Sequence, residues 1–245
     1  RAIPGNLLHE LINNNRIIGS TNEQGRKLAK EIYSSFVKGQ ILFTDETTAE
    51  TVKLMENTYR DVNIALANEL GNLSENVGVN IWEAIKLANM HPRVNLHKPG
   101  PGVGGYCIQK DPWFLHQLDS HQAKLIETAR FINDSRPSYT VDRLKEFIGS
   151  NGTISIFGVA FKGNVNDVRE SPATEIIGLL LNDGYKIKAY DPYVTNYDYQ
   201  IVELDEATKD SDCILIVADH DKFKDLDPEK ITNMKSKKIF DTRNI

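Results

Sequence analysis

The first half of the chain is dominated by apolar residues that recur every three or four positions, which is the spacing of one face of a helix. The longest such stretch begins at Thr47 or Thr48 and ends near Val77. Its apolar stripe consists of Val52, Met55, Tyr59, Val62, Leu66, Leu70 and Leu73. A helix of this length in a small domain is expected to pack against a copy of itself or to carry the domain core.

Shorter apolar stretches on either side predict further helices. We expect them over residues 4–15, 80–90, 122–135 and 138–148, over 21–38 with Thr21 as the N-cap, and from after Pro112 to Leu118. Two short apolar runs, 17–19 and 40–44, predict strands. Pro137 is expected to interrupt the chain, because proline lacks the amide hydrogen that a helix interior uses.

The pattern changes after Gly152. A buried-strand run is predicted at 153–157, and further strands at 186–190, 213–217 and 238–241. Helices are predicted between them at 171–182 and 204–210. Strands that alternate with helices favour a parallel, doubly wound sheet. The chain is therefore expected to be an α/β protein, with an α-helical middle part followed by the sheet.

Composition narrows the class of protein. Of 245 residues, 40% are hydrophobic and 26% charged, and the net charge of −5 comes without a basic run, which argues against nucleic-acid binding. The two cysteines lie far apart, which argues against a disulfide framework and favours a reducing compartment. No apolar run is long enough for a membrane span and no signal peptide is recognisable, so a cytoplasmic protein that does not insert in membranes is expected.

One segment, Lys98 to Phe114, concentrates residues that suit a functional loop. Four glycines, two prolines and Cys107 lie within ten residues of it, followed by Lys110 and Asp111. Glycines at this density allow positive φ angles and a close approach of backbone to a ligand, and the prolines stiffen the segment. Cys107 is interpreted as a presented thiol; the alternative is a surface turn with an incidental cysteine.

A second candidate follows the predicted strand at 153–157, where ligands gather in a doubly wound sheet. The segment from Gly158 to Ser171 contains a glycine turn, Lys162 and Arg169, and then opens a helix. Free N–H groups, the helix dipole and two cations favour a phosphate here. The segment is not G-x-G-x-x-G, so by itself it does not indicate a dinucleotide, and an ordinary connection with solvated charges is the alternative.

Lys53 and Asn57 lie four residues apart on the long predicted helix and therefore share a face. A lysine and an amide in this arrangement could hold a water or stabilise an oxyanion, although such a pair is more typical of a solvated face. Cys213 lies in an apolar run and is expected in the core. The six histidines have no metal-ligand spacing on a common helix face, so no metal site is predicted.

Three motifs, in this order, together resemble the UDP-glucose/GDP-mannose dehydrogenase family. They are Ala49 to Asn57 with Asn68-Glu69-Leu70, Gly104 to Asp111, and Gly158 to Lys162 with Asp167 to Ser171. The segments 91–100 and 111–114 are most similar to members that act on UDP-N-acetyl-D-mannosamine. Gln109-Lys110 is a departure, since it is more similar to the UDP-glucose branch.

The resemblance implies three domains: an N-terminal domain that binds NAD, a helical domain that forms a homodimer, and a Rossmann-like domain that binds the UDP-sugar. We expect residues 1–45 to be the closing segment of an NAD-binding domain otherwise missing from the chain. Residues 46–136 would be the central domain, with the catalytic loop and with dimer contacts through the helix 47–77. Residues 137–245 would be the UDP-sugar-binding domain, and the chain alone is expected to be inactive.

The resemblance also implies a reaction, the NAD-dependent oxidation of a sugar C6 hydroxyl to a carboxylate in two steps, for surface polysaccharide synthesis. Cys107 would form a thiohemiacetal and then a thioester, with Lys53 or Lys110 favouring its thiolate. Lys53 and Asn57 would stabilise the oxyanion, and Asp111 would act on the hydrolytic water. The remaining roles fall to Arg93, Gly104, Phe161 and Lys162 for substrate, and to Lys110 and Arg169 for NAD.

Two questions stay open at this level. The favoured sugar is UDP-N-acetyl-D-mannosamine, but UDP-glucose and UDP-N-acetylglucosamine are alternatives. A protein of another class, a dimerising nucleotide-binding module without redox activity, is also compatible with the chain.

Overall fold

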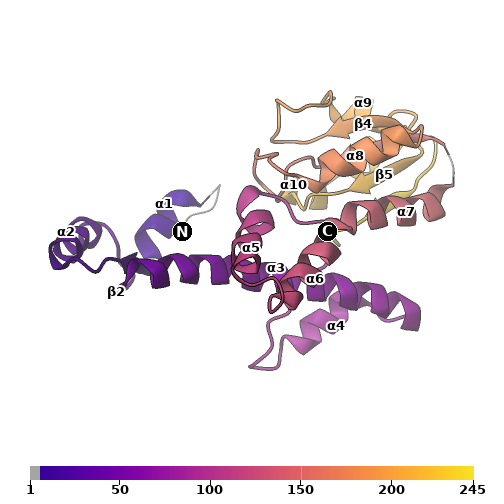
Figure 1. Cartoon of the computed structure of the whole chain (residues 1–245). Coiled ribbons are helices and arrows are strands. Elements are labelled where there is room, and N and C mark those ends of the chain that lie inside the picture. The colour runs from indigo at the N-terminus through magenta and orange to yellow at the C-terminus, as the bar shows by residue number, and fades with distance from the viewer. Residues whose placement is uncertain (1–5, 150) are drawn as a thin grey trace. The chain divides into compact units, whose positions relative to one another are not determined.

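The computed structural model describes residues 6–149 and 151–245, which form two compact units (Figure 1). The first unit extends to Thr58 and the second begins at Tyr59. Helix α3 (Glu46–Val77) contributes residues to both.

The first unit contains a small parallel sheet. Its elements are α1 (Leu7–Asn13), β1 (Arg16–Gly19), α2 (Glu23–Ser34) and β2 (Ile41–Thr44). The two strands pair in parallel with Arg16 opposite Ile41. Both predicted strands are confirmed, but the predicted N-cap of α2 is wrong: Asn22, not Thr21, accepts hydrogen bonds from the amides of Gln24 and Gly25 through its side chain.

The long helix α3 is confirmed, although none of the residues of its predicted apolar stripe is buried within this chain. It runs without interruption for 32 residues from its Asp45 cap, whose Oδ1 accepts from the Thr48 amide at 2.8 Å. Met55, Tyr59 and Leu73 on the predicted stripe are each more than half exposed. Neither this helix nor any other within the described ranges is long and apolar enough to cross a bilayer.

Four helices follow in the second unit: α4 (Ile81–Ala88), α5 (Tyr106–Leu118), α6 (Lys124–Asp134) and α7 (Arg136–Ile148). Two predicted boundaries are wrong, and both involve proline. Helix α5 contains Pro112 and begins six residues before it. Pro137 lies in the first turn of α7 instead of interrupting the chain, because the first turn needs no amide donor from that position.

The predicted doubly wound parallel sheet is confirmed. It consists of β3 (Thr153–Phe157), β4 (Lys186–Tyr190), β5 (Cys213–Ile216) and β6 (Ile239–Asp241), all parallel, in the order β4-β3-β5-β6. The connections contain α8 (Pro172–Asn182), α9 (Leu204–Thr208), α10 (Asp221–Lys224) and the 3₁₀ helix η1 (Pro228–Ile231). The last two were not predicted, since each spans only four residues.

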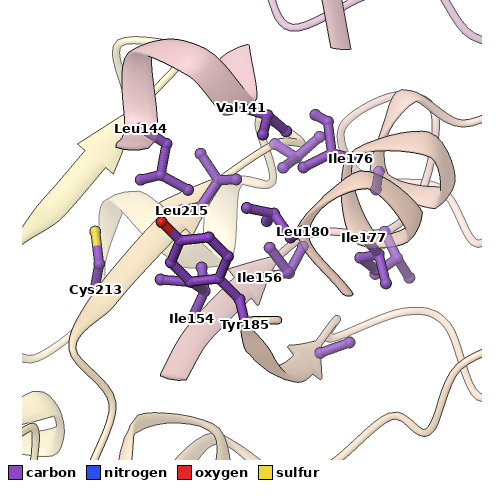
Figure 2. Close-up of a cluster of buried hydrophobic side chains, with 14 of the residues drawn as sticks. Val141, Leu144, Ile154, Ile156, Ile176, Ile177, Leu180, Tyr185, Cys213 and Leu215 are labelled. Atoms are coloured by element: carbon purple, nitrogen blue, oxygen red, sulfur yellow. The ribbon is translucent and has the colours of Figure 1, made fainter. Parts of the chain in front are cut away.

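Side chains that alternate along the strands form a core on each face of the sheet. On one face, Figure 2 shows Ile154, Ile156 and Leu215 against residues of α7 and α8, namely Val141, Leu144, Ile176, Ile177 and Leu180. On the other face, Phe157 and Ile216 pack with Ala207 of α9 and Phe223 of α10. Cys213 is fully buried in the first core, as expected from its apolar surroundings.

Candidate functional site

The glycine-rich segment from Lys98 to Gly105, here called the glycine loop, leads directly into α5. Gly105 is the N-cap, with a left-handed φ of 82°. Cys107 is exposed in the first turn of the helix. Asp111 lies four residues further and so shares a helix face with Cys107. The structure therefore places the candidate nucleophile at the start of a helix, where amide groups have no partner within the helix.

The glycines of this loop make room for residues of the sheet domain. A Cβ atom on Gly104 would lie 2.5 Å from the Cβ of Phe161, and one on Gly100 would lie 2.6 Å from Nη1 of Arg243. A Cβ on Gly102 would lie 3.0 Å from Pro172. The glycine loop thus lies directly against the candidate segment before α8, against the start of α8, and against Arg243 after β6.

Replacing Gly104 with alanine is expected to displace the loop, because its Cβ would overlap Phe161 and would lie 3.0 Å from the carbonyl oxygen of Glu170. We expect a loss of about 1–3 kcal/mol in the free energy of unfolding, measured by urea denaturation. Gly71→Ala is the matched control: its Cβ would make ordinary contact with Pro99 at 3.5 Å, and helix propensity predicts a gain of up to about 1 kcal/mol. Equal effects of the two changes would contradict the argument.

A cleft of about 460 Å³ lies between the glycine loop and the turn after β3. Among the described residues that line it are His97, Gly104, Phe161, Asp219 and four cations, Arg60, Lys98, Lys162 and Arg243. Arg243 is paired with Asp219 at 3.2 Å. Burial disfavours the Asp219 carboxylate, but Arg243 and backbone hydrogen bonds together lower its pKa. The excess of positive charge suits an anion such as a diphosphate.

A buried histidine–carboxylate pair fixes the backbone at the carboxyl ends of three strands. Asp191, directly after β4, accepts a hydrogen bond from the amide of Val159 at 2.8 Å and lies 3.0 Å from Nε2 of His220. Nδ1 of His220 accepts from the Asn164 amide at 2.9 Å, so Nε2 carries the proton and donates to Asp191. Burial opposes ionisation of Asp191, yet these hydrogen bonds lower its pKa overall.

The two cations predicted to face the cofactor meet at one aromatic ring beside the candidate nucleophile. The Lys110 ammonium lies 4.4 Å and the Arg169 guanidinium 5.3 Å from the centre of the Tyr106 ring. Arg169 also forms an ion pair with Asp167 at 2.5 Å. The hydrogen bond to the Asp167 carboxylate is the main cause of the raised pKa of Arg169, and electrostatic interactions with Tyr106 and Cys107 raise this pKa further. The sequence did not reveal this grouping around Tyr106.

Buried side-chain amides, which the sequence did not reveal, bind the backbone of the glycine loop. The Gly100 amide donates to Oδ1 of Asn68 at 2.8 Å, and Nδ2 of Asn68 donates to Asn133 at 3.0 Å. Nε of Arg136 donates to the Gly100 carbonyl at 3.0 Å. Both polar groups of the Gly100 peptide are therefore bound by side chains of neighbouring helices.

Asn133 connects these side-chain amides to a fully buried ion pair. Nδ2 of Asn133 donates to Oδ1 of Asp61 at 2.8 Å, and Asp61 also pairs with Arg130. All three side chains are at most 1% exposed. Burial raises the pKa of Asp61 and the Arg130 charge opposes that shift. Polar residues at core positions of α3 and α6 are the signal that could have revealed the network.

The other predicted site residues are placed as follows. Lys53 is exposed and Asn57 is 2% exposed, one turn apart on the part of α3 that belongs to the first unit. The solvated-face alternative is therefore wrong for Asn57. Arg93 is exposed in the turn after α4 and does not line the cleft. No cluster of three or more metal-ligating side chains occurs in the described parts of the chain.

Gly100 to Gly105 contains the letters of a G-x-G-x-x-G motif. A dinucleotide site of that kind requires a strand before the glycines and a helix after them. Here α5 follows, but residues 92–105 are extended loop or turn after helix α4. The structural context of the dinucleotide motif is therefore not met in this segment.

Comparison with known proteins supports the resemblance seen in the sequence. Residues 47–135 match the central domain of the UDP-glucose/GDP-mannose dehydrogenase family, and residues 155–245 match its UDP binding domain. Between them the two matches take in most of the chain. The chain belongs to this family.

Relatives with individual names are similar over the whole chain. A UDP-N-acetyl-D-mannosamine dehydrogenase from Methanocaldococcus jannaschii is 52% identical over 250 residues. An NDP-N-acetyl-D-galactosaminuronic acid dehydrogenase from Ralstonia solanacearum is 40% identical over 253 residues. Each match covers 100% of this chain, but only 58% and 59% of the respective relative. The chain thus spans a little over half the length of these proteins.

Solved structures give the same result for the fold. The UDP-D-ManNAc dehydrogenase of Pyrococcus horikoshii superposes with a TM-score of 0.91 at 44% identity, and the UDP-N-acetyl-mannosamine dehydrogenase of Staphylococcus aureus with 0.89 at 48%. Each comparison covers 100% of this chain and 59% of the solved one. The expected fold, a helical part followed by an α/β domain, is confirmed.

Proposed function

We propose that this chain is the dimerising and UDP-sugar-binding part of a NAD-dependent UDP-sugar 6-dehydrogenase. The observation that carries the proposal is the contact between the glycine loop and the turn that contains Phe161 and Lys162. The glycine loop leads into α5, whose first turn presents Cys107. The proposed division assigns residues 46–136 to the central domain and 137–245 to the UDP-sugar domain. UDP-N-acetyl-D-mannosamine is the proposed sugar, since similar proteins with 44–52% identity carry that name.

The proposed site begins with the UDP group. The cationic cleft would bind the diphosphate through Lys162, with Gly104 and Phe161 forming the wall beside it. In the same cleft the Arg243 guanidinium is paired with Asp219. The ammonium groups of Lys98 and Lys162, which also line the cleft, are exposed. Arg93, which is exposed outside the cleft, is proposed to reach the substrate of a second subunit.

Cys107 is proposed as the nucleophile. The C6 alcohol would first lose a hydride and its hydroxyl proton to give an aldehyde. The Cys107 thiolate would add to this aldehyde and form a C–S bond, giving a thiohemiacetal whose oxygen is anionic. Loss of hydride from C6 would leave a thioester, which water would cleave to a carboxylate and a free thiol. Asp111, on the Cys107 face of α5, is proposed to take a proton from that water. Lys53 and Asn57 are proposed to stabilise the oxyanion.

NAD⁺, when bound, would accept the two hydrides that C6 loses. The residues that fit it are Lys110 and Arg169, two exposed cations that meet over the Tyr106 ring next to Cys107. Cations beside an aromatic face are suited to phosphate oxygens and to a planar base. These contacts explain how the chain could hold one side of the cofactor.

A homodimer through α3 is proposed as well. Several large apolar residues of this helix are exposed, including Tyr59, Leu66, Leu73 and Val77. An amphipathic helix whose apolar side chains face solvent in one copy can bury them against a second copy.

The proposed function is tested by turnover. The 245-residue chain alone, mixed with NAD⁺ and a UDP-sugar, is expected to produce no NADH, because the reaction needs a dedicated NAD-binding domain. The full-length enzyme is expected to oxidise UDP-N-acetyl-D-mannosamine with a kcat/KM at least about tenfold above that for UDP-glucose or UDP-N-acetylglucosamine, which corresponds to about 1.4 kcal/mol.

Absorbance of NADH at 340 nm, with two NADH formed per uronate, is the measurement. Turnover by the chain alone would contradict the requirement for another domain. A full-length protein that binds UDP and dimerises, but oxidises none of the three sugars, would establish the non-catalytic module instead.

A further inference from the structure

Gln109 joins two segments that are far apart in the sequence. It lies two residues after Cys107 in α5 and is half-buried. Its Nε2 donates to the carbonyl oxygen of Val103, in the glycine loop, at 2.5 Å and to that of Glu170 at 3.3 Å. Glu170 belongs to the turn between β3 and α8. One amide group therefore links the helix of the nucleophile, the glycine loop and the nucleotide-binding turn.

The turn itself has an unusual backbone at the point of contact. Glu170 has a φ of 50°, in the left-handed region that costs a residue with a side chain about 1 kcal/mol or more. The preceding carbonyl, of Arg169, accepts from the Gly105 amide at 3.1 Å. Two successive carbonyls of the turn thus face the loop, one bound by the main chain and the other by Gln109.

We propose that Gln109 is a positioning residue for Cys107, an inference that rests on the proposed function. The UDP group would be held by the turn that contains Lys162, whereas the thiol is carried by the first turn of α5. The distance between the thiol and the sugar C6 therefore depends on how the first turn of α5 is held against Glu170. Gln109 is the side chain within the described residues whose amide donates to both segments.

The test replaces Gln109 with methionine, which has a similar length and no amide donor, in the full-length enzyme. We expect kcat to fall about 10- to 100-fold, since a displacement of about 1 Å can cost that much. KM for the UDP-sugar and the Kd of UDP are expected to change less than about threefold, because Gln109 does not itself line the cleft that is proposed to bind UDP. Gln109→Glu should lower kcat further, since its carboxylate would face two carbonyl oxygens.

Gln117→Met is the matched control, an exposed glutamine near the end of the same helix, and its kcat should equal that of the wild type. The proposal is overturned if kcat of Gln109→Met stays within twofold of the wild type. It is equally overturned if kcat, UDP affinity and Tm all fall together, because this pattern would indicate a purely structural role.

A second measurement separates this proposal from the proposed function. In the 245-residue chain Cys107 is exposed and Cys213 is buried, so alkylation of the native chain by iodoacetamide reports on Cys107. Gln109→Met should change this rate at least about threefold and Gln117→Met should not. An unchanged rate overturns the positioning role even if the enzyme is active, and a changed rate supports it even if no UDP-sugar is oxidised.

Discussion

Cys107→Ser in the full-length enzyme is expected to lower uronate formation by at least about 10³-fold, because a serine hydroxyl is a far weaker nucleophile than a thiolate. The variant should still bind UDP with wild-type affinity, since Cys107 does not line the cationic cleft. The measurement is NADH release under saturating substrate, together with UDP binding by calorimetry.

The chain supplies its own control for this experiment. Cys213 is the second cysteine, fully buried in the sheet core, and its thiol pKa is raised to about 11 by burial. Cys213→Ala should retain activity while losing about 1 kcal/mol or somewhat more of stability through the small cavity it leaves. Wild-type uronate production by Cys107→Ser would refute the nucleophile assignment, whatever the behaviour of the control.

Asp61→Ala is expected to be the most destabilising single change in the helical part, with a loss of about 3–5 kcal/mol in the free energy of unfolding. Removing this carboxylate leaves the Arg130 guanidinium in the core without one of its two acidic partners. Asn133 loses its side-chain acceptor and keeps only the backbone carbonyl of residue 61. The measurement is urea denaturation of the 245-residue chain at neutral pH, followed by circular dichroism.

The contrasting change is Glu127→Ala on the same helix as Arg130. Glu127 is paired with Lys124 at 3.4 Å, but both side chains are about half exposed or more, so the expected loss stays below about 1 kcal/mol. A loss of less than about 1 kcal/mol for Asp61→Ala would show that the buried pair contributes no more than a surface pair.

The elements that were predicted well are those with a strong local pattern. The strand from Cys213 is an unbroken apolar run, and the strands from Thr153 and Lys186 alternate polar and apolar residues. The periodicity of α3 extends over many turns, so local and global preferences agree in all of these elements. The boundaries at Pro112 and Pro137 failed for a physical reason. Proline is tolerated in a first turn and can be accommodated inside a helix, and the sequence does not say which applies.

The candidate site was predictable only in part. Cys107 was identified because it ends a glycine-rich segment, and Lys162 because it lies in a glycine turn that follows a strand. Residues that act through burial, such as Asn133, Asp191 and His220, have no local signature, since their partners lie dozens of residues away. Gln109 was recognised only as part of a motif and as a feature more similar to the UDP-glucose branch, and its two carbonyl partners required the structure.

The way the glycine loop is held has a consequence for the order of folding. Gly100 binds partners 32 and 36 residues away, and Gln109 binds one 61 residues away. Contacts at such separations require long loops to close first, which is entropically costly and slow. Helices and contacts between residues close in sequence can form early in folding, whereas the contacts that hold the glycine loop cannot. The strands of the parallel sheet pair over similar separations, so we expect the nucleophile to acquire its native surroundings only when the sheet forms, after the helices.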